Sequence, residues 1–144
     1  MVPNQDGLGC VRGIKENMQE LFEDIPVKPF KPVIYYDETL DCIRAIMADC
    51  SLTEVRLEDS PLVLLERNYV EDGQARYVCF HIEGARGICK KHGLKSKGVV
   101  NVSGILLFLS MIVKNPRIKG AIKEVALPIL ADHNIDEIEF PSNQ

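Results

Sequence analysis

The sequence predicts an α+β protein in which a small antiparallel sheet, with a central hairpin at 62–83, packs on one face against helices from both ends of the chain. Two observations favour this class: strand-like segments gather in the middle of the chain, and segments with helical spacing flank them. The 144 residues, 46% hydrophobic and 26% charged, are typical of one globular domain rather than of a disordered chain.

The N-terminal region, residues 1–32, is predicted to be a helix followed by a connector. Apolar residues recur there at helical spacing, at Val11, Ile14, Met18, Leu21, Phe22 and Ile25. Pro26, Pro29 and Pro32 then exclude a helix and favour an extended chain. We therefore expect a tethered helix that reaches over the domain or onto a neighbouring subunit.

The central region is predicted to hold four strands. Their β-branched, aromatic and leucine-rich runs lie at Val33–Tyr36, Leu52–Leu57, Leu62–Tyr69 and Gln74–Glu83. The residues 58–61 favour a turn, and Asp72-Gly73 is typical of the turn of a hairpin. The last two strands therefore form the hairpin at 62–83.

The segment 37–51 fits either a helix or a strand. Leu40, Ile43, Met47 and Cys50 would share one helical face, and the alanines and methionine of this stretch favour a helix. We expect a helix here, with a strand over 38–48 as the alternative.

The C-terminal third is predicted to be mostly helical. A short helix is expected at Ala85–His92, and a longer one at 104–114 with Ser103 as its N-cap. Asn115 and Pro116 predict the cap and first position of a final helix, and Pro128 should kink this helix or end its regular part. An acidic tail, residues 134–144, closes the chain, and its segment 135–140 is a candidate edge strand.

The net charge of −4 hides a strong asymmetry along the chain. Residues 1–32 sum to −1, 33–72 to −7, 73–123 to +9 and 124–144 to −5. We expect the acidic and basic segments to neutralise each other within the fold or between copies; the alternative is a basic surface for an anionic ligand. An acidic total makes nucleic-acid binding unexpected.

Cysteine usage and the chain start suggest a reducing location. The five cysteines are an odd number, and the first residues carry no signal-peptide pattern, so we expect a cytoplasmic protein with free thiols and no membrane span. The longest apolar stretch, 99–113, is shorter than the roughly 20 residues that a span requires and is interpreted as a core helix.

Two groups of residues are candidate sites. Cys79, His81, Cys89 and His92 place two ligand pairs on a strand and the following helix, which could hold a tetrahedral Zn²⁺. The alternative is that both cysteines are buried and both histidines lie at the surface. A second group is basic and would bind a small anion, or else form a solvated helix face: Arg86, Lys90, Lys91, Lys95 and Lys97.

Residues 36–85 carry a short pattern: Tyr36-Asp37-Glu38, Asp41, Glu54, Asp72-Gly73 and Ile82-Glu83. This pattern resembles a small β-meander family of unknown function. The resemblance implies a strand within 38–48 and implies no activity. The chain departs from the family where Cys42-Ile43-Arg44 replaces an aromatic strand and where Leu65-Glu66-Arg67 replaces an acidic strand end.

Three functions compete. The first is a non-enzymatic binding or regulatory module that self-associates, most simply as a dimer, because the helix at 104–113 is unusually apolar for a small domain. The second is a metal- or redox-sensing protein that uses the Cys/His group. The third is an enzyme or binder of an anionic small molecule at the basic group. No pattern of catalytic residues is recognised, since a GxSxG motif and a phosphate-binding glycine loop are both missing.

Overall fold

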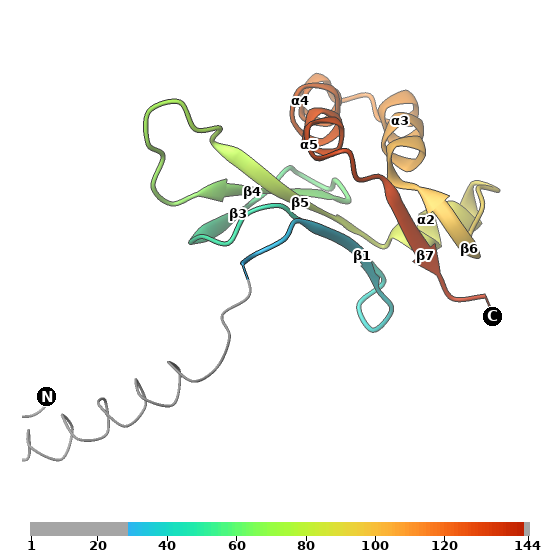
Figure 1. Ribbon diagram of the computed structural model, residues 1–144. Coiled ribbons are helices and arrows are strands. Elements are labelled where there is room, and N and C mark those ends of the chain that lie inside the picture. Colours follow the sequence, from blue (N-terminus) through green and yellow to red (C-terminus); the bar gives the residue numbers. More distant parts are fainter. Residues whose placement is uncertain (1–28, 143–144) are drawn as a thin grey trace, which may run out of the picture.

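The computed structural model describes residues 29–142, and these form a five-stranded antiparallel sheet, a separate two-stranded sheet, and helices on one face of the larger sheet (Figure 1). The larger sheet has the order β1-β2-β5-β4-β3, with strands β1 (Val33–Asp37), β2 (Cys42–Ile46), β3 (Leu52–Arg56), β4 (Leu62–Arg67) and β5 (Tyr77–Glu83). The smaller sheet pairs β6 (Gly98–Asn101) with β7 (Glu137–Phe140). The helical segments are α2 (Ala85–Lys91), α3 (Val102–Ile112), α4 (Pro116–Ala121), η1 (Ile122–Ala126) and α5 (Leu127–His133). The predicted α+β class is confirmed; the helix expected near the N-terminus lies outside the described residues.

The central hairpin is also confirmed. Strands β4 and β5 pair antiparallel, with Leu64 opposite Phe80, and a register shift falls between Leu65 and Glu66. The connection between the strands turns at Gly73, whose φ of +82° suits glycine.

The helix expected over 37–51 is wrong, because this segment forms the second strand of a hairpin. All five residues of β1 pair with β2, from Val33 opposite Ile46 to Asp37 opposite Cys42. The turn ends at Asp41, which takes a left-handed φ of 49°. Pairing of Ile43 with Ile82 of β5 buries the strand in the middle of the sheet, and this contact outweighs the helix propensity of the local sequence.

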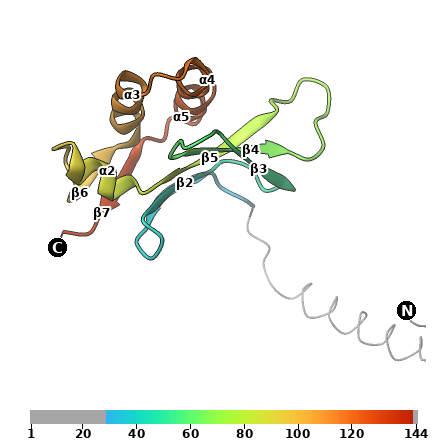
Figure 2. The same cartoon turned by 180° about the vertical axis from the view of Figure 1, so that it is seen from behind.

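The core lies between the larger sheet and the helices (Figures 1 and 2). Alternate residues of the central strands face it, including Ile43, Phe80 and Ile82, and the helices contribute Leu106 and Ile122. The residues between them, such as Arg44 and His81, therefore point to the opposite side of the sheet.

The last helix follows the prediction at its start and differs from it in the middle. The side chain of Asn115 accepts a hydrogen bond from the Arg117 amide at 2.9 Å, with Pro116 at the first helical position. Pro128 neither ends the helix nor leaves it regular. Instead a π-helical turn, η1, precedes it, and the Leu127 amide bonds to the carbonyl of Ile122, five residues back. The wider turn accommodates a proline, which has no amide hydrogen to donate.

The core helix expected at 99–113 is wrong in its first residues, because 98–101 form the strand β6, which gives the acidic tail its partner. The expected edge strand at 135–140 is β7, which pairs with β6 rather than with the larger sheet. Val99 lies opposite Glu139, and Asn101 lies opposite Glu137. Phe140 packs edge-on against Tyr36 of β1 at 4.7 Å between ring centroids, which fixes the small sheet beside the large one.

Candidate functional site

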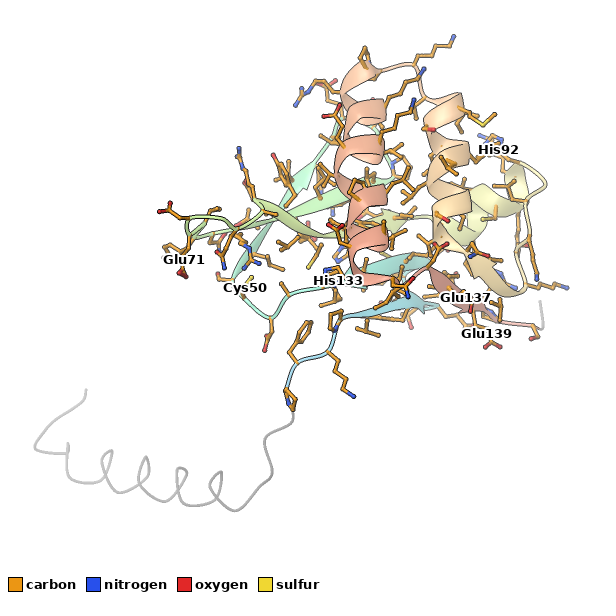
Figure 3. The ribbon with its side chains drawn as sticks, turned by 45° about the horizontal axis from the view of Figure 1, so that its top comes forward. Cys50, Glu71, His92, His133, Glu137 and Glu139 are labelled. Atoms are coloured by element: carbon orange, nitrogen blue, oxygen red, sulfur yellow. The ribbon has the colours of Figure 1, made fainter. Side chains whose placement is uncertain are left out.

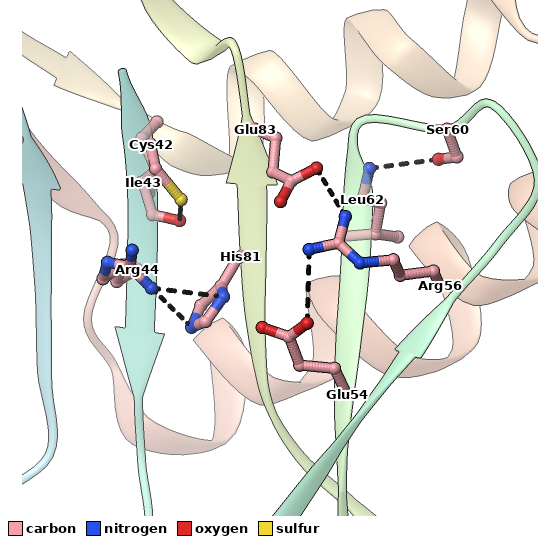
Figure 4. Close-up of polar contacts among 9 residues, drawn as sticks. All are labelled: Cys42, Ile43, Arg44, Glu54, Arg56, Ser60, Leu62, His81 and Glu83. Carbon is pink, nitrogen blue, oxygen red and sulfur yellow. Dashed lines mark hydrogen bonds and ion pairs between the residues drawn. The ribbon is translucent and has the colours of Figure 1, made fainter. Parts of the chain in front are cut away.

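The outer face of the larger sheet, away from the helices, carries a row of charged side chains (Figure 4). Arg44 pairs with Asp37 at 3.3 Å between Nε and Oδ2. Arg56 bridges two carboxylates, with Nη1 at 2.8 Å from Glu83 and Nη2 at 3.2 Å from Glu54. These ion pairs bring opposite charges of the outer sheet face into direct contact.

His81 lies in the middle of this row and is only 7% exposed. Nη1 of Arg44 is 3.4 Å from Nδ1 and 3.3 Å from Nε2, so it stands over the ring rather than in line with either nitrogen. Burial, followed by the positive charge of Arg44, lowers the pKa of His81. The hydrogen bond from Arg56 lowers the pKa of Glu83. The outer sheet face therefore keeps a neutral histidine between two paired arginines.

The predicted metal ligands do not come together. Cys79 and Cys89 are fully buried; the Cys79 sulfur lies 3.3 Å from the Met47 amide, and burial raises the pKa of Cys89. His81 lies on the outer sheet face, whereas His92 is exposed and packs on Phe108 of α3 at 4.9 Å between ring centroids. Across residues 29–142 no group of three or more His, Cys, Asp or Glu side chains has a geometry that would hold a metal ion.

The predicted basic group separates into a buried arginine and exposed lysines. Arg86 is buried, and it donates from Nε to the Ser96 carbonyl at 2.8 Å and from Nη2 to the Pro141 carbonyl at 2.9 Å. It thereby ties two loops together rather than facing a ligand. The others remain at the surface, namely Lys90, Lys91, Lys95 and Lys97.

Two helices obtain their N-terminal caps from distant acids. The Asp41 carboxylate accepts the amides of Arg86 and Gly87 in α2, at 2.7 and 3.1 Å, while Gly84 before the helix has no side chain to offer. Tyr36 donates its hydroxyl to the same carboxylate at 2.8 Å, and burial together with this contact raises the pKa of the tyrosine.

Asp136 caps α3 in the same manner. It accepts the amide and the hydroxyl of Ser103, each at 2.6 Å, and Nδ2 of Asn101 at 2.9 Å. Ser103, the predicted N-cap, therefore does not cap α3 itself. It donates its hydrogen bonds to Asp136, which caps the helix from another part of the chain. Sequence reasoning missed both aspartates, because a cap that is remote in sequence leaves no local pattern; the one available signal was at α2, where Gly84 before the helix offers no capping side chain.

The outer side of α3 is apolar and open to solvent. The helix contains no charged residue. Leu107 is 50% exposed, Met111 78% and Ile112 43%, although the opposite side of the same helix is buried in the core. We call the exposed row the α3 stripe; its spacing is that of one helical face, and it consists of Gly104, Leu107, Phe108, Met111 and Ile112.

A hollow of about 340 Å³ lies at the N-terminal end of the α3 stripe. Its wall is formed by Gly104 and Ile105 of α3, by Val99 of β6, and by Leu94, with Lys95 and Asn101 also contributing. A side chain added at Gly104 would meet no atom within 4 Å. The α3 stripe and this hollow therefore form one continuous apolar surface (the base of α3, near Glu137, is seen in Figure 3).

The ion pairs of residues 29–142 all join residues between 37 and 83. The lysines of the basic segment take no part in them, and neither do the acids after residue 123. Within the described part of the chain, the +9 and −5 segments therefore do not neutralise each other through direct contacts.

Comparison with protein-family models, with curated proteins and with solved structures finds no match for this chain. Among the described helices, none has the length and apolar character needed to cross a membrane. The proposal about function therefore rests on the exposed apolar surface of α3.

Proposed function

We propose that the protein is a non-enzymatic binding module that works as a self-associated homo-oligomer, with the α3 stripe as its contact surface. The observation that carries this is an eleven-residue helix without a single charge whose outer row is half or more exposed at Leu107 and Met111. Large apolar side chains gathered on one exposed face mark an interaction surface more often than isolated ones do.

A second copy of the chain is the partner that this surface fits. Because α3 carries no charge, two copies can bring their stripes together without burying an unpaired ion, which would cost several kcal/mol. Lys95 at the hollow and the exposed Lys114 after the helix place charged side chains beside this apolar surface, as in the rim of an interface.

The test measures mass in solution as a function of concentration, by light scattering after size exclusion and by sedimentation velocity. The variant Leu107→Glu removes an apolar contact worth about 1.5–3 kcal/mol and places a charge in the contact, so we expect at least a tenfold rise in the dissociation constant. Leu40→Glu is the matched control, because Leu40 is 63% exposed in the β1–β2 turn, away from α3. A wild-type protein that stays monomeric at high concentration would contradict the proposal.

A further inference from the structure

We infer that two copies pack α3 against α3 in antiparallel fashion about a two-fold axis, with Met111 of each copy seated in the hollow over Gly104 of the other. This rests on the proposed self-association and adds to it an orientation and a register. The inference uses three observations: a projecting side chain, a hollow that fits it, and the spacing between the two.

Met111 is the projecting side chain. At 78% exposure it is the most exposed apolar residue of the α3 stripe, and it is the penultimate residue of the helix. A methionine side chain is unbranched and flexible, so it fills an irregular apolar hollow well. Nothing in residues 29–142 covers it.

The hollow lies at the other end of the same stripe. Gly104 lines it together with the apolar residues Ile105, Val99 and Leu94. Lys95 also lines it, and a lysine can lay its methylene chain along an apolar surface while its ammonium stays in water. The volume of about 340 Å³ admits a methionine side chain with room for the rim to close around it.

The spacing selects the antiparallel orientation. Gly104 and Met111 are seven residues, about 10.5 Å, apart along the helix, with the midpoint between Leu107 and Phe108. A two-fold axis through this midpoint places Met111 over Gly104 twice and Leu107 against Phe108 at the centre. A parallel pair would instead bring Met111 against Met111 and leave both hollows unfilled.

The charges at the two ends of α3 agree with this orientation. Lys114 follows the helix and is exposed, and in the antiparallel register it falls opposite Asn101 of the second copy. Asn101 is the register partner of Glu137, another exposed residue (Figure 3). Lys114 of one copy thus comes near Asn101 and Glu137 of the other, and members of the +9 and −5 segments come together between copies.

Disulfide cross-linking tests the orientation in the full chain. In a background with the exposed Cys50 and with Cys10 replaced by serine, Gly104→Cys and Met111→Cys proteins are mixed and oxidised with glutathione disulfide. We expect the mixture to give the Gly104→Cys/Met111→Cys cross-linked dimer, whereas Gly104→Cys alone gives little. Efficient linking of Met111→Cys to itself, with none in the mixture, would overturn the inference in favour of a parallel pair.

Filling the hollow tests the register without weakening the fold. In Gly104→Leu the added Cβ meets no atom within 4 Å, and leucine is a better helix former than glycine, so the melting temperature should stay the same or rise. The dissociation constant of the dimer should rise at least tenfold. Gly120→Leu in α4 is the matched control, since a Cβ there meets its nearest atom at 4.0 Å. If the dimer persists unchanged in Gly104→Leu, this packing is wrong although self-association stands; if the wild type is monomeric, both proposals fail.

Discussion

The outer sheet face and the α3 stripe lie on different sides of the molecule. The first carries charged side chains that are paired with one another, and the second carries apolar side chains that are exposed to solvent. On the sheet, Arg44 and Arg56 each hold a carboxylate of the same face, and His81 is buried among them without a charge. On α3, Leu107 and Met111 project into solvent with no neighbour to cover them. The polar groups of the sheet face have partners within one chain, whereas the stripe leaves apolar area exposed to water, which the proposed second copy would cover.

This difference shows where a partner is to be expected. Polar groups that already have partners gain little from a new contact, because binding exchanges one set of interactions for another. Exposed apolar area gains from every contact that removes it from water. The most charged face of this chain is therefore the less promising place to look for association.

The largest effect should come from breaking the support of the α3 stripe. Asp136→Ala removes the acceptor for the amide and hydroxyl of Ser103, and we expect the free energy of unfolding to fall by roughly 2 kcal/mol. Because Gly104 lies in the turn that frays, dimer formation should weaken as well. Urea denaturation and sedimentation velocity measure the two effects. Asp136→Asn keeps an acceptor oxygen and should lose less of both.

Asp41→Ala is the comparison for that variant. It removes the same kind of cap from α2 and leaves the Tyr36 hydroxyl without its partner, so a loss of roughly 2 kcal/mol in the free energy of unfolding is expected. The hydrogen bonds of Asp41 all lie outside α3, although His92 and Leu94 after α2 border the α3 stripe and the hollow, so the dissociation constant should rise less than in Asp136→Ala, by roughly threefold or less. An equally weakened dimer would show that association senses general stability rather than the stripe.

A moderate effect concerns pH and the outer sheet face. The pKa of His81 is lowered in the folded state, so below a pH of about 6.5 the unfolded chain takes up a proton that the folded chain refuses, and stability falls as pH falls. His81→Gln should flatten this slope, which can reach about 1.4 kcal/mol per pH unit, in urea titrations at fixed protein concentration. His133→Gln, at an exposed position, is the matched control and should keep the slope.

At acidic pH the dependence of stability on pH is expected to come from a different group, Glu83. Glu83 has its pKa lowered by Arg56, so the stability that it contributes is present above its ordinary value near 4.5 and is lost as the pH falls below it. A slope that persists above pH 5 in His81→Gln would therefore contradict the assignment to His81.

A smaller effect should follow from Arg44→Met. This change removes the positive charge from above the His81 ring and should raise the pKa of the histidine, as followed by NMR titration of its ring protons. Burial is the larger cause of the shift, so the pKa should still lie below its ordinary value. Complete recovery of an ordinary pKa would mean that the ring becomes exposed in the variant.

The smallest effect is expected for Arg56→Ala. The guanidinium lies at the surface, where water and salt screen its two carboxylate contacts, so the contribution that it makes through Glu83 is small and the melting temperature should fall only slightly. Thermal unfolding followed by circular dichroism checks this. A clear loss would show that the pairs of the outer sheet face stabilise the fold as well as arranging its charges.

Much of the fold follows from patterns within single segments. The alternation at Tyr77–Glu83, the turn at Gly73 and the Asn115-Pro116 start are local signals, and each predicts its element correctly. The segment 37–51 does not, because its helical spacing competes with pairing to β5, which no local window contains. The strand β6 is four residues long, and its partner lies near the end of the chain, so its pattern is equally weak.

The candidate site, too, could be predicted from local sequence only in part. The apolar character of the 104–113 helix is a property of one segment, and it directs attention to the correct element. Which side of that helix remains uncovered depends on how α3 packs against the core, and the hollow over Gly104 combines Leu94 and Val99 from outside the helix. The predicted roles of Arg86 and of the Cys/His group depended on which neighbours the fold would supply.

The borrowed caps have a consequence for how the chain comes to be folded. The ribosome makes the first turn of α3 33 residues before it makes Asp136, and β7 follows directly after that aspartate. Until then the Ser103 amide has no acceptor from the protein, and a helix of eleven residues is marginal by itself in water. We therefore expect the α3 stripe to form only after Asp136 has been made, so that growing chains on neighbouring ribosomes would not associate through it earlier.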